Sequence, residues 1–140
     1  MAIFPNPNWL TALCEKLNTD EQYGRIAQKW EGDFLFVIEA ASALTQPVYA
    51  YIDLWHGKCR ETKVINDPQS VKAAFTLSAP YPNFVSLLKG EVDPMQAMLT
   101  RKLKVQGNMA VLMRSVPTVL DFVRCCREVT DGFLGQAPEK

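Results

Sequence analysis

Residues able to do chemistry are few in this sequence, and they lie far apart. The single histidine, His56, occupies a predicted turn with no obvious acid or nucleophile beside it, a position typical of solvated surface. Asp53 lies inside a predicted strand, where we expect its carboxylate to be hydrogen-bonded to a neighbouring strand or loop. The sequence contains no nucleophile elbow, phosphate-binding loop or zinc-ligand spacing. We therefore expect a protein that is not an enzyme, with catalysis by Asp53 or His56 as a minor alternative.

The four cysteines do not form a recognisable metal or disulfide pattern. They occur without a CxxC pair or nearby histidine, and the adjacent Cys125 and Cys126 are poorly placed either to share a metal or to form a disulfide. We interpret them as reduced thiols, which are typical of a cytoplasmic protein. No metal and no cofactor are expected.

Length and composition indicate one globular domain over residues 1–140. The chain is 48% hydrophobic and 21% charged, and its 15 basic and 15 acidic residues cancel. A chain without net charge has no long-range field to attract nucleic acid or an anionic membrane, so neither is expected as a principal partner. The sequence contains no secretory signal and no apolar run of about 18 residues, so stable membrane insertion is not expected.

The few polar candidates must be held by a mixed set of helices and strands. Apolar residues at helical spacing predict helices over residues 8–17 and 20–30, with Thr19 and Gln22 as a capping box before the second. Alternating or continuously apolar runs predict five strands. These lie at residues 33–40, 48–55, 59–65, 71–79 and 102–106.

The strand at 102–106 is flanked by two methionine-rich helical segments. Met95 and Met98 follow the helix start Asp93-Pro94, and Met109 and Met113 follow Gly107-Asn108. Methionine adapts to irregular shapes, so these faces fit either an ordinary core or the wall of a binding site. Beyond Pro117 an apolar face continues to about residue 129.

The order of these motifs resembles the type-2 sterol carrier protein family. The resemblance includes Asp53-Leu54-x-x-Gly57, residues 73–77, residues 84–90 and Asp93-Pro94-Met95. Its most specific part is RKLKVQGNM at residues 101–109, which departs from the family pattern only at Arg101, where the family usually has glycine.

The resemblance implies a fold and a function. The fold would be α/β (α+β), with a five-stranded, twisted, mainly antiparallel sheet and helices packed on one side around an apolar lipid tunnel. The function would be that of an intracellular carrier of fatty acids, acyl-CoA, sterol-like or isoprenoid lipids. The residues expected to line the tunnel are Phe75, Leu77, Phe84, Leu88, Met95, Met98, Leu103, Val105, Met109, Leu112, Met113, Leu120 and Phe122.

A second function remains open. The same apolar groove would suit a non-catalytic accessory module that docks a partner protein, or a second copy of the chain, or presents a lipid intermediate to another enzyme. Residues 130–140 would then form part of the contact. The sequence does not distinguish this module from a carrier, nor does it identify the lipid.

Overall fold

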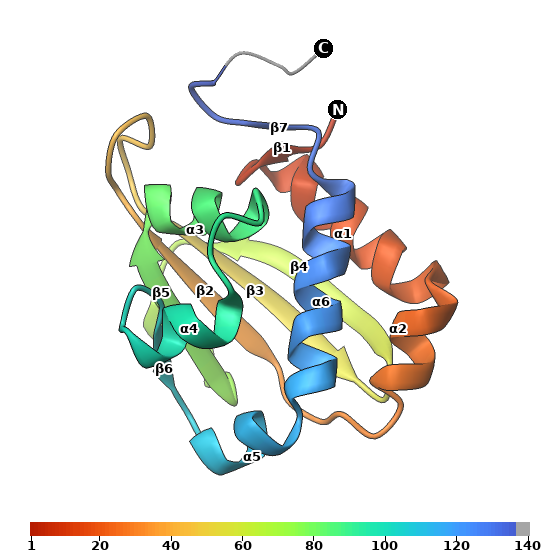
Figure 1. Ribbon diagram of the computed structural model, residues 1–140. Coiled ribbons are helices and arrows are strands. Elements are labelled where there is room, and N and C mark those ends of the chain that lie inside the picture. Colours follow the sequence, from red (N-terminus) through yellow and green to blue (C-terminus); the bar gives the residue numbers. More distant parts are fainter. Residues whose placement is uncertain (137–140) are drawn as a thin grey trace.

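A five-stranded sheet forms the centre of the computed structural model, which describes residues 1–136 (Figure 1). The strand order is β4-β3-β2-β5-β6, and only the central pair β2–β5 is parallel. The mainly antiparallel five-stranded sheet expected from the sequence is therefore confirmed. Its strands are β2 (Phe34–Glu39), β3 (Val48–Trp55), β4 (Lys58–Ile65), β5 (Phe75–Pro80) and β6 (Lys104–Gln106).

The burial of each strand follows its sequence pattern. The continuous apolar run of β2 is buried on both faces, as a central strand requires. In β3, Ala50, Ile52 and Leu54 are buried, while Tyr49 and Tyr51 on the other face are partly exposed. β5 begins later than predicted, because the 3-10 helix η1 (Pro68–Ser70) and an extended segment precede it.

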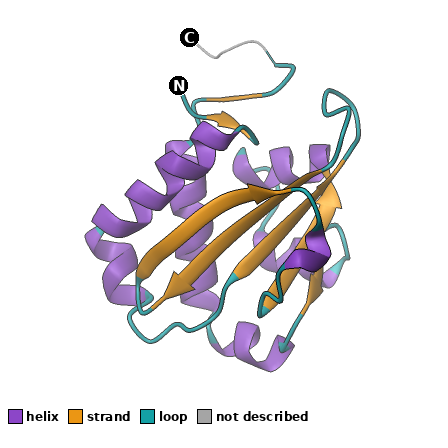
Figure 2. Cartoon of the chain, turned by 180° about the vertical axis from the view of Figure 1, so that it is seen from behind, coloured by secondary structure: helices purple, strands orange, loops and turns teal. Residues whose placement is uncertain are grey.

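The α-helices gather on one face of the sheet, and the view from behind shows the strands of the opposite face (Figures 1 and 2). This arrangement confirms the predicted placement of helices on one side. The helices are α1 (Pro7–Thr19), α2 (Glu21–Ile26), α3 (Tyr81–Leu88), α4 (Pro94–Leu99), α5 (Met109–Arg114) and α6 (Val116–Val129).

One helix prediction was wrong in detail. Asp20, not Thr19, caps α2, because its carboxylate accepts a hydrogen bond from the Tyr23 amide at 2.9 Å. The helix predicted from the Asn108 cap to about Ser115 is confirmed as α5, and the apolar face beyond it belongs to a new helix, α6, with Pro117 in its first turn. Because α5 and α6 are separate helices, the residues that α6 turns toward the sheet do not continue the helical spacing of α5.

The two ends of the described chain are joined beside the main sheet. β1 (Ile3–Phe4) pairs in parallel with β7 (Gly132–Phe133), which the sequence did not predict. Phe4 is fully buried, with its ring 4.9 Å from that of Trp9. Residues 137–140, which belong to the segment expected to contact a partner, lie outside the described residues. Within residues 1–136, no helix combines the length and apolar character needed to cross a bilayer.

Candidate functional site

An apolar cavity of about 50 Å³ lies between the sheet and helices α3, α4, α5 and α6. Every residue that lines it is apolar or a cysteine. The lining consists of Phe4, Phe34, Phe36, Leu77, Phe84, Leu87, Leu88, Pro94, Met98, Leu103, Leu112, Val119, Phe122, Val123 and Cys126.

The spacing of the apolar residues along each strand and helix determines which of them face the cavity. Phe34 and Phe36 are two residues apart on β2 and so share its inner face. Helix α6 contributes residues at helical spacing, and the ring of Phe122 packs edge-on against that of Phe34 at 5.2 Å. The cavity is thus a gap in an aromatic core, bounded on one side by one face of α6.

Seven of the residues predicted from the sequence line this cavity. They come from β5, from α3 to α5, from the segment before β6, and from α6. They are Leu77, Phe84, Leu88, Met98, Leu103, Leu112 and Phe122.

The other six predicted residues lie outside the lining. Met109, Met113 and Leu120 are exposed, so their predicted inward orientation was wrong. The α5 helix has six residues and buries Leu112 alone. The new start of α6 places Val119, Phe122, Val123 and Cys126 inward and leaves Leu120 outside.

Phe75, Met95 and Val105 are also absent from the cavity wall. Phe75 is buried behind the wall, with its ring packed against those of Trp30 at 5.6 Å and of the wall residue Phe34 at 5.9 Å. Met95 is half-buried against the core, and Val105 lines an outer hollow together with Met109.

Several wall residues were missed. The i, i+2 spacing of Phe34 and Phe36 was a usable signal, as was the helical spacing of Val119 and Cys126 with Phe122. Phe4 carried no local signal, because it reaches the cavity through the pairing of β1 with β7.

The cavity in this structure is too small for a long acyl chain, since a protein cavity of about 150 Å³ holds only a molecule the size of benzene. A large ligand therefore requires outward movement of a wall. Met98 and Leu103 line both the cavity and an outer hollow beside β6, so they form a thin partition there. Leu88 likewise separates the cavity from a second hollow beside β7.

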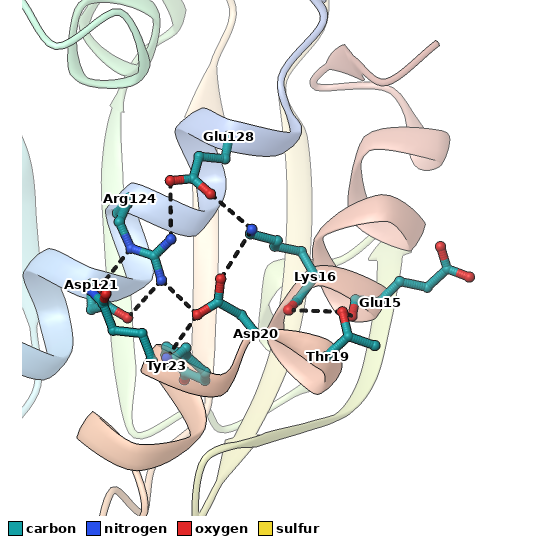
Figure 3. Close-up of polar contacts among 9 residues, drawn as sticks. Glu15, Lys16, Thr19, Asp20, Tyr23, Asp121, Arg124 and Glu128 are labelled. Atoms are coloured by element: carbon teal, nitrogen blue, oxygen red, sulfur yellow. Dashed lines mark hydrogen bonds and ion pairs between the residues drawn. The ribbon is translucent and has the colours of Figure 1, made fainter.

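The α6 wall is fixed to α1 and α2 by a network of charged side chains (Figure 3). Arg124 of α6 donates hydrogen bonds to Asp121 at 2.8 Å, Asp20 at 2.7 Å and Glu128 at 3.0 Å. Lys16 of α1 pairs with Asp20 and Glu128 at 3.0 and 2.8 Å. The network thus connects the cavity wall to the first two helices.

This network also determines the protonation of its members. The hydrogen bond from Arg124, followed by that from the Tyr23 amide, holds the pKa of Asp20 well below its ordinary value. Lys16, followed by Arg124, lowers the pKa of Glu128. Asp20, Asp121 and Cys125 place possible ligand atoms within 4.8 Å of one another, but the Arg124 guanidinium already occupies both carboxylates. The group is therefore an ion-pair network.

Comparison with known families identifies the chain. Residues 10–119 match the family model described as the SCP-2 sterol transfer family. The chain belongs to this family. No curated protein matches it.

Solved structures that are similar to this chain have the same fold. A crystal structure of sterol carrier protein 2 is 28% identical, with a TM-score of 0.81 over 89% of this chain and 98% of the other. A conserved hypothetical protein from Thermus thermophilus is 27% identical, with a TM-score of 0.81 over 93% of this chain and 92% of the other. The sterol carrier protein-2 of Aedes aegypti, solved with palmitate, is 15% identical, with a TM-score of 0.54 over 84% of this chain and 92% of the other.

The two polar candidates from the sequence lie away from the cavity lining. Asp53 accepts two hydrogen bonds from Arg60 on β4, at 3.0 and 3.1 Å, which confirms the expected contact with a neighbouring strand. His56 lies 2.6 Å from the carboxylate of Glu31, an acid that no sequence pattern placed beside it. Both side chains of this second pair are more than half exposed.

The cysteines are free thiols, as expected. Cys125 and Cys126 are both buried, but only Cys126 lines the cavity. Burial raises the pKa of Cys125 to about 11 and that of Cys126 well above its ordinary value. Both are therefore neutral, unreactive wall or core residues at physiological pH.

Proposed function

We propose that this chain is an intracellular, non-catalytic lipid carrier that holds a long apolar ligand between its sheet and helix α6. The observation that carries the proposal is the cavity lined wholly by apolar and cysteine side chains. Such a wall stabilises a ligand by removing its apolar surface from water, at about 25 cal/mol per Å². A ligand head group would stay at the rim, where polar residues are available.

The ligand class follows from the chemistry of the wall. Aromatic rings and Met98 present few directional contacts, so the site would select for apolar length and shape more than for one molecule. Fatty acids, acyl-CoA, sterol-like and isoprenoid lipids all meet this requirement. Because the cavity is small, entry would proceed by displacement of α4 or α6, whose side chains form its helical walls.

The test is direct binding. The purified chain would be examined by native mass spectrometry for lipids acquired during expression, then stripped of them and titrated with a fluorescent fatty acid. Palmitate should displace the probe. If no lipid co-purifies and neither ligand binds below about 100 μM, the carrier function is wrong. A stoichiometric protein partner without any bound lipid would instead support an accessory module.

A further inference from the structure

One segment of the chain is basic although the whole chain carries no net charge. Residues 94–120 contain Arg101, Lys102, Lys104 and Arg114 but no aspartate or glutamate. All four basic residues are exposed, and none forms an ion pair within residues 1–136. The expectation drawn from net charge missed this asymmetry, because acids elsewhere in the chain balance the total.

The same segment exposes apolar side chains. Leu99 is 67% exposed and Met113 48%, and Met109 and Leu120 are also exposed. These four make up most of the large apolar side chains that are exposed among the described residues. Free positive charge and exposed apolar groups therefore occur together here.

These residues belong to elements that adjoin in space. Helix α4, strand β6, helix α5 and the start of α6 lie at the end of the molecule away from the paired β1 and β7 (Figure 1). Met98, Arg101, Lys104 and Met109 line one surface hollow at this end. Because Met98 also lines the internal cavity, the basic surface and the cavity share a wall.

We propose that this basic face, defined as the exposed basic and apolar side chains of residues 99–120, docks on an anionic lipid bilayer. Lysine and arginine are attracted to the negative surface of such a bilayer, and exposed apolar side chains enter its interfacial layer. The cavity partition at Met98 and Leu103 then faces the membrane from which an apolar ligand would be exchanged. This last step rests on the proposed carrier function, whereas docking itself does not.

Other partners match either the positive charge of this face or its apolar side chains, but not both. A second copy of the chain packed across a twofold axis would place this basic face against itself, bringing like charges together. Nucleic acid supplies phosphates but no apolar layer for Leu99 and Met113. A bilayer that contains anionic lipid meets both requirements.

Charges on neighbouring elements do not cancel the face. Asp93 caps the opposite end of α4, and Asp121 is neutralised by Arg124. The hollow beside β7 differs in this respect, because Lys89 and Arg127 are accompanied there by Glu91 and Asp131. The surface at α4, β6 and α5 is therefore the better complement to an anionic membrane.

The test measures flotation of the full chain with vesicles of phosphatidylcholine, with and without about one-third phosphatidylglycerol. Lys102→Gln, Lys104→Gln and Arg114→Gln combined should lower binding to the anionic vesicles roughly 100-fold. A control with Lys58→Gln, Lys63→Gln and Lys89→Gln removes the same charge elsewhere and should keep most of the binding. Added salt should weaken binding of the unmodified chain.

A second variant tests the apolar contribution. Leu99→Gln with Met113→Gln changes only exposed positions and should lower vesicle binding about 10-fold, with the unfolding midpoint unchanged. Equal binding by the basic-face and control variants would overturn the proposal, as would failure of the unmodified chain to bind anionic vesicles. Self-association or nucleic-acid binding through this face, in place of vesicle binding, would also overturn it.

Fatty-acid binding without vesicles separates this proposal from the carrier function. The basic-face variants should bind the fluorescent fatty acid like the unmodified chain, because none of the changed residues lines the cavity. Vesicle binding without fatty-acid binding would leave docking supported and the carrier function refuted. Fatty-acid binding without vesicle binding would support the carrier function and refute docking.

Discussion

The guanidinium of Arg124 on α6 donates a hydrogen bond of 2.7 Å to the carboxylate of Asp20, the residue that caps α2. The same guanidinium also contacts Asp121, the one charged residue among the described positions that is buried. Because α6 supplies one wall of the apolar cavity, this contact fixes the wall against the first two helices. The ion-pair network is thus the structural element that opposes movement of α6.

Replacement of Arg124 by methionine should lower the free energy of unfolding by roughly 2–4 kcal/mol, because Asp121 loses its charge partner while remaining buried. Gln22 still donates a hydrogen bond to Asp121 at 2.6 Å, which keeps the loss from being larger. Urea unfolding measures the change. Amide hydrogen exchange should become faster in α6 and remain nearly unchanged in β3.

Lys16→Met is the matched control for this change. Lys16 pairs with Asp20 and Glu128 but not with the buried Asp121, so its replacement leaves no buried charge unpaired and should lower the free energy of unfolding by only about 0–1 kcal/mol. Equal losses for the Arg124 and Lys16 variants would show that burial of Asp121 does not govern the network.

Acid should weaken the same connection. The folded-state pKa values of Asp20 and Glu128 lie below their ordinary values of 3.8 and 4.5, so the unfolded chain binds protons first as the pH falls. The stabilisation by these carboxylates is complete above their ordinary pKa values and is lost as the pH falls below that range toward the folded values. The free energy of unfolding, measured in urea from pH 7 to pH 3, should therefore decrease most steeply below about pH 4.5.

The Arg124→Met variant provides the comparison for this pH dependence. Without Arg124, the pKa of Asp20 returns toward its ordinary value, and the decrease at acid pH should become shallower. Parallel pH profiles for the two proteins would mean that other carboxylates produce the acid sensitivity.

The strands of the sheet were predictable because the pattern of apolar and polar residues within each strand shows which of its faces is buried. Alternation in β3 and the continuous apolar run of β2 report directly which faces are buried. Asp93 and Asn108 were recognised as helix caps for the same reason, since each accepts a hydrogen bond from an amide a few residues along the chain. Family resemblance then supplied the arrangement of these elements.

The inner face of the last helices was harder to predict. Met109 and Met113 are as compatible with solvent at a helix surface as with a cavity wall, and the interruption at Ser115 changes which side of α6 faces inward. The network could not be read from the sequence at all, because Arg124 and Asp20 are separated by 104 positions. Long-range pairing also explains why Phe4 was missed.

Arg101, the one residue that departs from the family motif, lies in the turn before β6 and provides a further prediction. Arg101 has a φ of 61°, in the left-handed region, where a side chain is unfavourable and glycine is not. Arg101→Gly should therefore raise the free energy of unfolding by about 0.5–1 kcal/mol, measured in urea. Arg101→Ala removes the same charge but keeps a Cβ atom, so it should give no such gain. An equal gain from both would assign the effect to charge.

Adjacent residues on α6 offer the sharpest test of the cavity as a binding site. Val119 is buried in the cavity wall, whereas Leu120, its neighbour, is 38% exposed and outside the lining. Val119→Phe would fill the cavity and should weaken fatty-acid binding by about 10-fold or more, with a loss of roughly 1–3 kcal/mol in stability from overpacking.

Leu120→Phe adds bulk one position along the same helix, at the surface. It should leave both fatty-acid binding and stability nearly unchanged, because its side chain does not reach the cavity. Fluorescent fatty-acid titration without vesicles measures both variants under the same conditions. If Leu120→Phe reduced binding as strongly as Val119→Phe, ligand would occupy the outer side of α6, and the wall defined by Val119, Phe122 and Cys126 would not be the binding surface.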